Sequence, residues 1–153
     1  MIIRSATLHD TGRCSELLGL LFDKESEFNP DPERQEKGLS MIIENPSSGT
    51  VLVCEESENG CIAGMVILLY TISTALGRKV ALLEDLIVDP AYRSRGVGTM
   101  LLGHAFELAA EKSLGRITLL TDHDNTAAHR LYEKSGFSRS GMVVFRKIIS
   151  PGE

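Results

Sequence analysis

A short segment near the middle of the chain combines two arginines with two glycines. Arg93, Arg95, Gly96 and Gly98 lie between an apolar stretch and a segment with the apolar spacing of a helix. The first N–H groups of a helix have no partner inside it, and with the positive end of the helix dipole they attract anions. Glycines let a phosphate approach the backbone, and arginines add positive charge. The segment is therefore predicted to bind a phosphate group.

Two neighbouring carboxylates, Glu84 and Asp85, interrupt the stretch 80–88, which is otherwise nearly all apolar and typical of a buried strand. A carboxylate in such a place is either paired or functional, and burial raises its pKa toward the range of a proton acceptor at neutral pH. Side chains alternate between the two faces of a strand, so Glu84 and Asp85 are not expected to face the same cleft.

The elements that must position these groups follow from the apolar spacing and from turn signals. Asn59-Gly60 predicts a hairpin between two strands, and Asp31 followed by Pro32 predicts a helix start. The predicted strands are residues 2–6, 50–55, 62–72, 80–88, 117–121 and 142–149, and the predicted helices begin at Thr7 and Asp31 and span 100–112 and 125–135. This order indicates one domain over residues 1–153 with an α+β (α/β) fold and a mixed sheet, whose parallel part lies in the unit 80–121.

The phosphate-binding segment matches neither of the two commonest fingerprints, because Leu101 stands where G-x-G-x-x-G requires glycine and no G-x-x-x-x-G-K-[ST] is present. It resembles instead the signature of the GCN5-related N-acetyltransferase (GNAT) superfamily, [RQ]-x-x-G-x-[GA], through Arg93, Gly96 and Gly98. Residues 124–137 resemble a second block of that family, N-x-x-A-x-x-L-Y-x-x-x-G-F. The resemblance covers the order of elements along nearly the whole chain and is residue-specific from about Leu82 to Phe137.

The resemblance implies the GNAT (acyl-CoA N-acyltransferase) fold, a mostly antiparallel six- to seven-stranded sheet flanked by about four helices, with splayed central parallel strands. It also implies acetyl-CoA as cosubstrate, with no metal. The pyrophosphate would lie on the N–H groups of Arg95 to Thr99, and the pantetheine arm would pair with the strand at Leu86 to Val88. The residues expected to bind the cofactor are Leu86, Ile87, Val88, Arg93, Ser94, Arg95, Gly96, Val97, Gly98, Thr99, Asn125 and Ala128.

The resemblance further implies transfer of acetyl to a primary amine by direct attack in a ternary complex. Tyr132 would protonate the leaving thiolate; it is seven residues, about two helical turns, after Asn125, so both project from one face with Ala128. The alternative for Tyr132 is a core tyrosine with a bonded hydroxyl. The residues 122–124 do not predict a metal site, because three consecutive loop residues rarely ligate one ion.

Glu84 is our first choice as the general base, since the Glu-Asp pair resembles the polyamine acetyltransferases of the superfamily. His123 and His129 are rivals, and a salt bridge of Glu84 with Arg78 or Lys79 is the structural alternative. The acceptor is expected to be a small, polyamine-like or amino-acid-like amine. The alternatives are a protein N-terminus or lysine as the acceptor, or a catalytically silent acyl-CoA-binding regulatory module.

Composition limits the class of partner. The 153 residues carry a formal charge of −5, which gives no overall attraction to nucleic acid or to an anionic membrane. The acidic run 23–36 is either a solvated face or an attractor for a cationic amine. Three cysteines without a CxxC pair favour a reducing compartment, and no signal peptide or membrane span is recognised, so a cytoplasmic location is expected. Homodimers are common in the family, but no feature of this sequence indicates whether this chain forms a homodimer.

Overall fold

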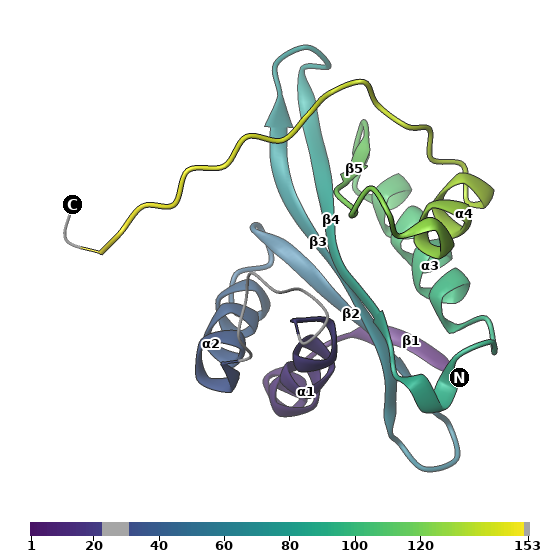
Figure 1. Ribbon diagram of the computed structural model, residues 1–153. Coiled ribbons are helices and arrows are strands. Elements are labelled where there is room, and N and C mark those ends of the chain that lie inside the picture. The colour runs from purple at the N-terminus through teal and green to yellow at the C-terminus, as the bar shows by residue number, and fades with distance from the viewer. Residues whose placement is uncertain (23–30, 152–153) are drawn as a thin grey trace. The chain divides into compact units, whose positions relative to one another are not determined.

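The computed structural model describes residues 1–22 and 31–151. They divide into two compact units, Met1–Leu120 and the residues from Thr121 onward. The first unit is a twisted sheet with helices on both of its faces (Figure 1). The acidic stretch 23–30 lies outside the described residues, and the organisation of the chain as one domain stays a prediction.

The sheet has five strands in the order in which they occur along the chain. They are β1 (Ile2–Ser5), β2 (Gly49–Glu55), β3 (Ile62–Ser73), β4 (Arg78–Val88) and β5 (Ile117–Leu119). Neighbouring strands are antiparallel except β4 and β5, which are parallel. The mixed, mostly antiparallel sheet is therefore confirmed, with its parallel pair in the expected unit, but it has five described strands rather than six or seven.

The first two helical segments begin where capping residues predict, whereas the helix predicted to span 100–112 begins already at Val97. Thr7 donates its N–H to Asp10 Oδ2 over 2.7 Å at the short 3-10 helix η1 (Leu8–Asp10), which leads directly into α1 (Thr11–Phe22). Asp31 accepts the Arg34 N–H over 3.2 Å and caps α2. The other elements are α2 (Pro32–Ile43), the 3-10 helix η2 (Pro90–Tyr92), α3 (Val97–Glu111) and, in the second unit, α4 (Thr126–Lys134).

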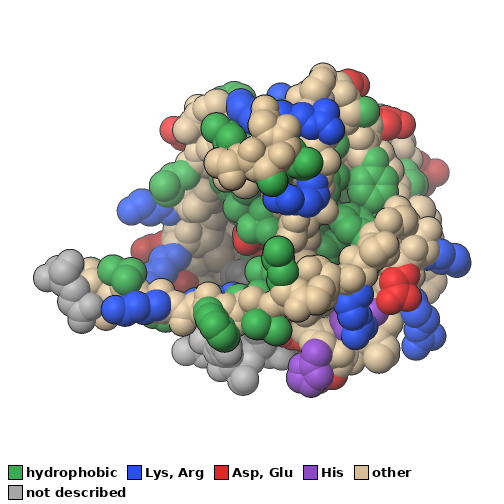
Figure 2. Space-filling view, turned by 90° about the horizontal axis from the view of Figure 1, so that it is seen from above, with side chains coloured by type: hydrophobic (Ala, Val, Ile, Leu, Met, Phe, Trp, Pro, Cys, Tyr) green, Lys and Arg blue, Asp and Glu red, His purple; other side chains and the backbone are tan. Residues whose placement is uncertain are grey.

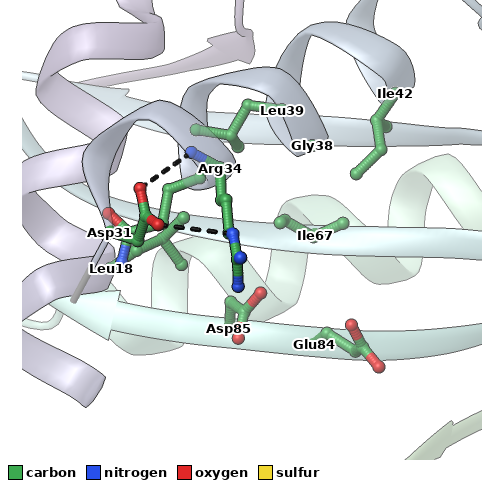
Figure 3. A pocket seen from close by; sticks show the side chains of 10 residues that line it. Leu18, Asp31, Arg34, Gly38, Leu39, Ile42, Ile67, Glu84 and Asp85 are labelled. Atoms are coloured by element: carbon green, nitrogen blue, oxygen red, sulfur yellow. Dashed lines mark hydrogen bonds and ion pairs between the residues drawn. The ribbon is translucent and has the colours of Figure 1, made fainter. Parts of the chain in front are cut away.

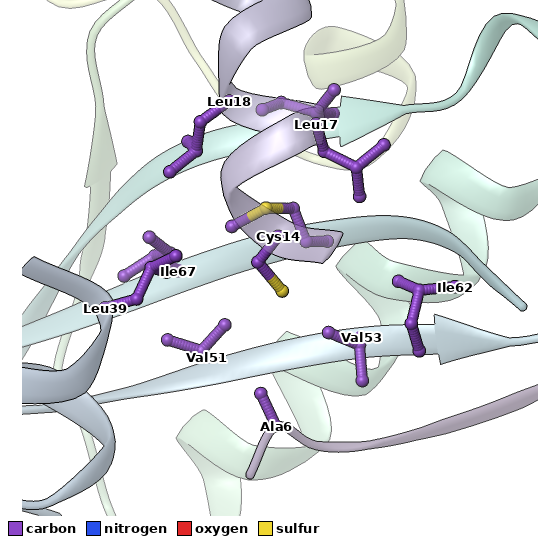
Figure 4. Packing of buried hydrophobic residues seen from close by; sticks show 11 residues of the cluster. Ala6, Cys14, Leu17, Leu18, Leu39, Val51, Val53, Ile62 and Ile67 are labelled. Carbon is purple, nitrogen blue, oxygen red and sulfur yellow. The ribbon is translucent and has the colours of Figure 1, made fainter. Parts of the chain in front are cut away.

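Both faces of the sheet are covered in the first unit. On one face α1 and α2 pack a cluster that includes Cys14, Leu39 and Val53, all buried (Figure 4). On the other face α3 lies so close to β3 that a Cβ on Gly64 would lie 3.1 Å from the Val97 side chain. The central strands are therefore buried on both sides, which explains their nearly continuous apolar sequence.

β4 is irregular at its centre. Ile87 pairs with Met65 and Glu84 with Ile67, so two residues of β4 lie opposite one of β3, as in a β-bulge. Asp85 lies in the bulge with φ of 55°, a left-handed conformation that only a few residue types, including Asp, adopt readily. The expectation that Glu84 and Asp85 cannot share a cleft was therefore wrong, because a bulge breaks the alternation on which it rested.

The pairing of β4 with β5 is short. It joins Ala81 to Ile117, Leu82 to Thr118 and Leu83 to Leu119, and β5 ends there. Beyond Leu83, no strand within the described residues pairs with this edge of β4. The two central parallel strands thus separate as expected.

The strand predicted at residues 142–149 is absent from the described part of the chain. The segment has strand-forming side chains, yet they are exposed, by 95% for Phe145 and 90% for Met142. In Figure 2 its hydrophobic and basic side chains lie uncovered along the segment that ends in the grey C-terminal atoms. Strand preference acts through packing and pairing with a neighbour, and residues 138–150 belong to no described ladder, so the prediction fails.

Candidate functional site

The loop after β4 leads into a helix start without a side-chain cap. Asp89 accepts the Ala91 N–H over 2.8 Å and so begins η2, after which Ser94 and Gly96 have φ of 63° and 77°. Gly96 is the N-cap of α3 and supplies no side-chain hydrogen bond. The first main-chain bond into it is donated by Met100, so the N–H groups of residues 97–99 have no helical partner. Three donors and the helix dipole thus converge, as predicted, and can hold an anion.

The charged side chains of this loop are directed to solvent. Arg93, Ser94, Arg95 and Thr99 are exposed, whereas the Val97 side chain is buried, so Val97 can offer a ligand only its main chain. The Arg95 guanidinium lies 5.4 Å from the centre of the Tyr92 ring, a cation–π distance. Within the described residues neither Arg93 nor Arg95 forms an ion pair, so both charges are available to a phosphate.

The strand edge expected to pair with a pantetheine arm has no partner strand in the described part of the chain. Val88 and Ile87 pair with Gly64 and Met65 of β3 on one side. On the other side the ladder to β5 ends at Leu83, so the edge at Leu86 to Val88 offers main-chain groups to a ligand. Their side chains are buried or half-buried, which leaves the backbone as the part that a ligand can use.

A pocket of about 350 Å³ lies beside this part of β4, between it and the two N-terminal helices. Figure 3 shows the aliphatic side chains of Leu39, Ile42 and Ile67 along it, and Arg34 reaching from α2 toward Asp85. The described lining residues are Leu18, Asp31, Arg34, Gln35, Gly38, Leu39, Ile42, Ile67, Glu84 and Asp85. The pocket is therefore apolar along its length and carries three carboxylates against one guanidinium.

Glu84 lines this pocket but is exposed rather than buried, which corrects the expectation from its apolar surroundings. The alternative of a salt bridge with Arg78 or Lys79 is not found among the described residues, where no ion pair involves Glu84. A solvent-accessible carboxylate at the mouth of a pocket can accept a proton from an amine directly or through water.

The α2 side of the pocket contains polar groups that the sequence did not single out as site residues. Arg34 Nε is 3.3 Å from Asp31 Oδ2. Gln35 Oε1 accepts the Ser15 hydroxyl over 2.8 Å, while its Nε2 is buried without a partner among the described residues. Asp31 was recognised only as a helix cap, because the pocket depends on contacts between α2 and β4 that no local pattern records.

The remaining predicted site residues belong to the second unit. Tyr132 packs edge-on against Phe137 with ring centres 5.9 Å apart, and burial raises the pKa of its hydroxyl, which therefore keeps its proton at neutral pH. Asn125 is the N-cap of α4 and not a residue within it; its Oδ1 accepts the Ala128 N–H over 3.2 Å. The amide nitrogen of Asn125 and the second lone pair of its Oδ1 are left for a cofactor.

His129, a rival base, has both ring nitrogens engaged. Nε2 is 2.7 Å from the Asp122 carbonyl and Nδ1 is 3.2 Å from Arg139 Nη2. These contacts leave neither ring nitrogen of His129 free to meet an amine, whereas Glu84 lines the pocket. Across the residues placed in the structure, no group of three His, Cys, Asp or Glu could hold a metal ion, and no helix has the length and apolar character needed to cross a membrane.

The comparisons with known proteins agree with this geometry. Residues 15–137 match the model of the acetyltransferase (GNAT) family. An uncharacterized N-acetyltransferase of Bacillus subtilis is 33% identical over 140 residues, covering 90% of this chain and 89% of its own. The thialysine N-epsilon-acetyltransferase of Bos taurus is 31% identical over 81 residues, covering 53% of this chain and 47% of its own.

The fold is shared with solved acetyltransferases. A putative acetyltransferase from Agrobacterium tumefaciens is 26% identical and superimposes with a TM-score of 0.79, covering 95% of this chain and 100% of its own. A probable acetyltransferase of known crystal structure reaches a TM-score of 0.84 at 24% identity, with 98% and 99% covered. The family match and the relative from Bacillus subtilis establish that this chain belongs to the GNAT acetyltransferase family.

Proposed function

We propose that this chain transfers an acetyl group from acetyl-CoA to the primary amine of a small, positively charged aliphatic molecule. The observation that carries the proposal is the continuity of three features: an open edge of β4, an uncapped start of α3, and a carboxylate-bearing pocket beside the same strand. A thioester ligand with a pantetheine arm and a pyrophosphate needs the first two, and an amine acceptor needs the third.

The residues present fit acetyl-CoA, which would supply the activated acetyl group. Gly96 has no side chain that could compete for the N–H groups of residues 97–99, and these groups would hold the pyrophosphate with help from Arg93 and Arg95. The main chain of Leu86 to Val88 would pair with the pantetheine arm and so orient the thioester.

The chain's own side chains then move protons. Glu84 would take a proton from the ammonium group of the acceptor, so that the neutral amine can attack the thioester carbonyl. A C–N bond would form and the C–S bond would break, and the Tyr132 hydroxyl would give its proton to the departing thiolate. The nitrogen loses its second proton as it becomes an amide, and this proton would restore the Tyr132 hydroxyl directly or through water. The raised pKa of Tyr132 supports this role, since the hydroxyl remains protonated at the pH of the reaction.

The lining of the pocket supports the choice of acceptor. Leu39, Ile42 and Ile67 suit an aliphatic chain, and the three carboxylates favour positive charge over negative. The name of the bovine relative describes acetylation at the epsilon nitrogen of thialysine, an amine on a flexible chain. Anionic acceptors such as sugar phosphates are expected to react poorly.

The proposal is tested by thiol release from acetyl-CoA, with the product identified by its gain of one acetyl group in mass spectrometry. The acceptors are 1,4-diaminobutane, lysine, butylamine, 4-aminobutyrate, an aminoglycoside and a short peptide. Dications and lysine are expected to give the highest kcat/KM and 4-aminobutyrate the lowest. No thiol release with any amine would contradict the transferase activity and favour a silent acyl-CoA-binding module, whereas a strong preference for the peptide would favour a protein acceptor.

The role of Tyr132 is tested by the pH dependence of kcat. Its raised pKa predicts that kcat falls only above the ordinary tyrosine value of about 10. Tyr132→Phe is expected to lower kcat and to remove this alkaline decline. An unchanged kcat in Tyr132→Phe, with the alkaline decline retained, would assign the protonation of the thiolate to another group.

A further inference from the structure

Asp89 occupies the junction between β4 and the loop that leads to α3. Its main-chain N–H donates to the Ala63 carbonyl over 2.8 Å, so the residue is held to β3. Its Oδ1 accepts from Ala91 and its carbonyl accepts from Tyr92, each over 2.8 Å, so it also sets the path of η2. Four residues separate η2 from α3. The position of Asp89 therefore determines where the main-chain N–H groups at the start of α3 lie.

Arg13 lies in the first turn of α1 and stabilises this junction from outside β4. Nη2 forms an ion pair with Asp89 Oδ2 and also donates to the Ile62 carbonyl over 3.1 Å. Nε donates to the same carbonyl over 3.3 Å, and Nη1 lies 3.1 Å from Glu16 Oε2. One planar guanidinium thus joins the beginning of β3 to the end of β4.

The Arg13–Asp89 ion pair is partly buried, which strengthens the attraction between the two charges. The side chains of Arg13 and Asp89 are 30% and 20% exposed, so water screens the pair only partly. The Ala91 N–H and then Arg13 hold the pKa of Asp89 below its ordinary value, which keeps the carboxylate charged at neutral pH. A lysine could keep the charge, but its one ammonium nitrogen cannot replace the planar set of Nε, Nη1 and Nη2, which together contact Ile62, Glu16 and Asp89.

We infer that Arg13 is a positioning residue for the phosphate-binding loop: it acts through Asp89, without touching the ligand, to hold the start of α3 in the arrangement that binds the pyrophosphate of the acetyl donor. The inference rests on the proposed use of acetyl-CoA. It predicts that loss of the guanidinium weakens the binding of donors that carry the pyrophosphate and spares donors that lack it.

The test compares two acetyl donors, acetyl-CoA and S-acetylpantetheine, which has the same thioester and arm but no pyrophosphate. In Arg13→Gln the KM for acetyl-CoA is expected to rise about 10-fold, as for the loss of one charge-assisted contact, with kcat changed less than about two-fold. The kcat/KM for S-acetylpantetheine should stay within about two-fold of the wild-type value. Arg13→Lys should resemble Arg13→Gln, and Asp89→Asn should shift the acetyl-CoA KM in the same direction.

Arg4→Gln is the matched control. Arg4 is a similarly half-buried arginine that holds two carboxylates, Asp10 over 2.8 Å and Glu55 over 2.7 Å, but it lies on β1. Its loss is expected to lower the melting temperature without changing the ratio of the two donors' kcat/KM values. An equal loss with both donors in Arg13→Gln, or full rescue by Arg13→Lys, would overturn the inference and leave a role in stability.

The proposed function and the positioning role of Arg13 can be contradicted independently of each other. If the wild type acetylates no amine with either donor, the proposed function fails, and the dissociation constants of CoA and pantetheine, measured by calorimetry, then decide the inference. A selective loss of CoA affinity in Arg13→Gln would support it, and equal affinities in variant and wild type would overturn it.

Discussion

The two halves of β4 share a direction and a neighbour on one side, and they differ on the other. From Val80 to Leu83 the strand pairs with β3, and from Ala81 onward also with β5; Val80, Ala81 and Leu83 are no more than 3% exposed. From Glu84 to Val88 its partner among the residues that the structure describes is β3 alone, and this half contains the bulge and lines a pocket. Complete pairing on both edges serves stability, whereas an unpaired edge leaves main-chain groups that a ligand can use.

The bulge marks the boundary between these halves. A left-handed conformation costs an ordinary residue about 1 kcal/mol or more, and Asp85 nevertheless stands there. The result is that two consecutive carboxylates line one pocket, which a regular strand could not arrange. The comparison therefore predicts that substitutions before the bulge change stability and that substitutions after it change activity.

The largest expected effect is a loss of stability after a substitution in the paired half of β4, Val80 to Leu83. Leu83→Ala should lower the free energy of unfolding by about 3 kcal/mol, because it removes a buried side chain from a strand bonded on both edges. Urea denaturation measures the loss, and kcat/KM per folded molecule should stay close to the wild-type value. A loss below about 1 kcal/mol would show that this half is not the stable one.

The next largest effect is a loss of activity after a substitution in the other half of β4, Glu84 to Val88. Glu84→Gln should lower kcat/KM about 100-fold, since it removes the proposed proton acceptor while keeping the shape of the side chain. Its free energy of unfolding should change by less than about 0.5 kcal/mol, because Glu84 is exposed.

Glu58→Gln is the control for this change, as it neutralises an exposed carboxylate in the turn between β2 and β3. It should leave both quantities unaltered. A Glu84→Gln enzyme with wild-type kcat/KM would move the role of base to another group.

The smallest effect concerns the bulge itself. Asp85→Gly is expected to be more stable than Asp85→Ala by about 1 kcal/mol, because glycine adopts positive φ without a steric cost and alanine does not. At a regular strand position the order is the reverse, so thermal denaturation of the two variants distinguishes the cases. If the alanine variant were the more stable, the left-handed conformation at Asp85 would be contradicted.

Much of the fold could be predicted because its signals are local. Asp31 caps α2 and Asn59-Gly60 lies between β2 and β3, each as the residues indicate. The helix predicted to span 100–112 is also present, but α3 begins earlier, at Val97. The failures depend on distant contacts: the strand predicted at 142–149 lacks a partner in the described residues, and the bulge at Asp85 comes from the register between β3 and β4.

The candidate site, like the fold, has one part that could be predicted from local sequence and one part that could not. The geometry of the loop that we propose binds an anion could be predicted, because a strand, a glycine turn and a helix start are consecutive in the chain. The pocket proposed for the acceptor could not be predicted, since α1, α2, β3 and β4 each contribute to it and only their packing brings Leu18, Arg34 and Glu84 together. Arg13 carried no signal at all, because its partner Asp89 is 76 residues away.

The central claim is that the open edge of β4 binds the arm of acetyl-CoA, and hydrogen–deuterium exchange tests it most directly. In the free protein the amides of residues 84–88 should exchange faster than those of residues 80–83. Saturating acetyl-CoA should slow exchange at residues 86–88 and at 97–99 by about 10-fold or more, and leave residues 80–83 unchanged. Unaltered exchange at residues 86–88, in the presence of bound acetyl-CoA, would contradict the account.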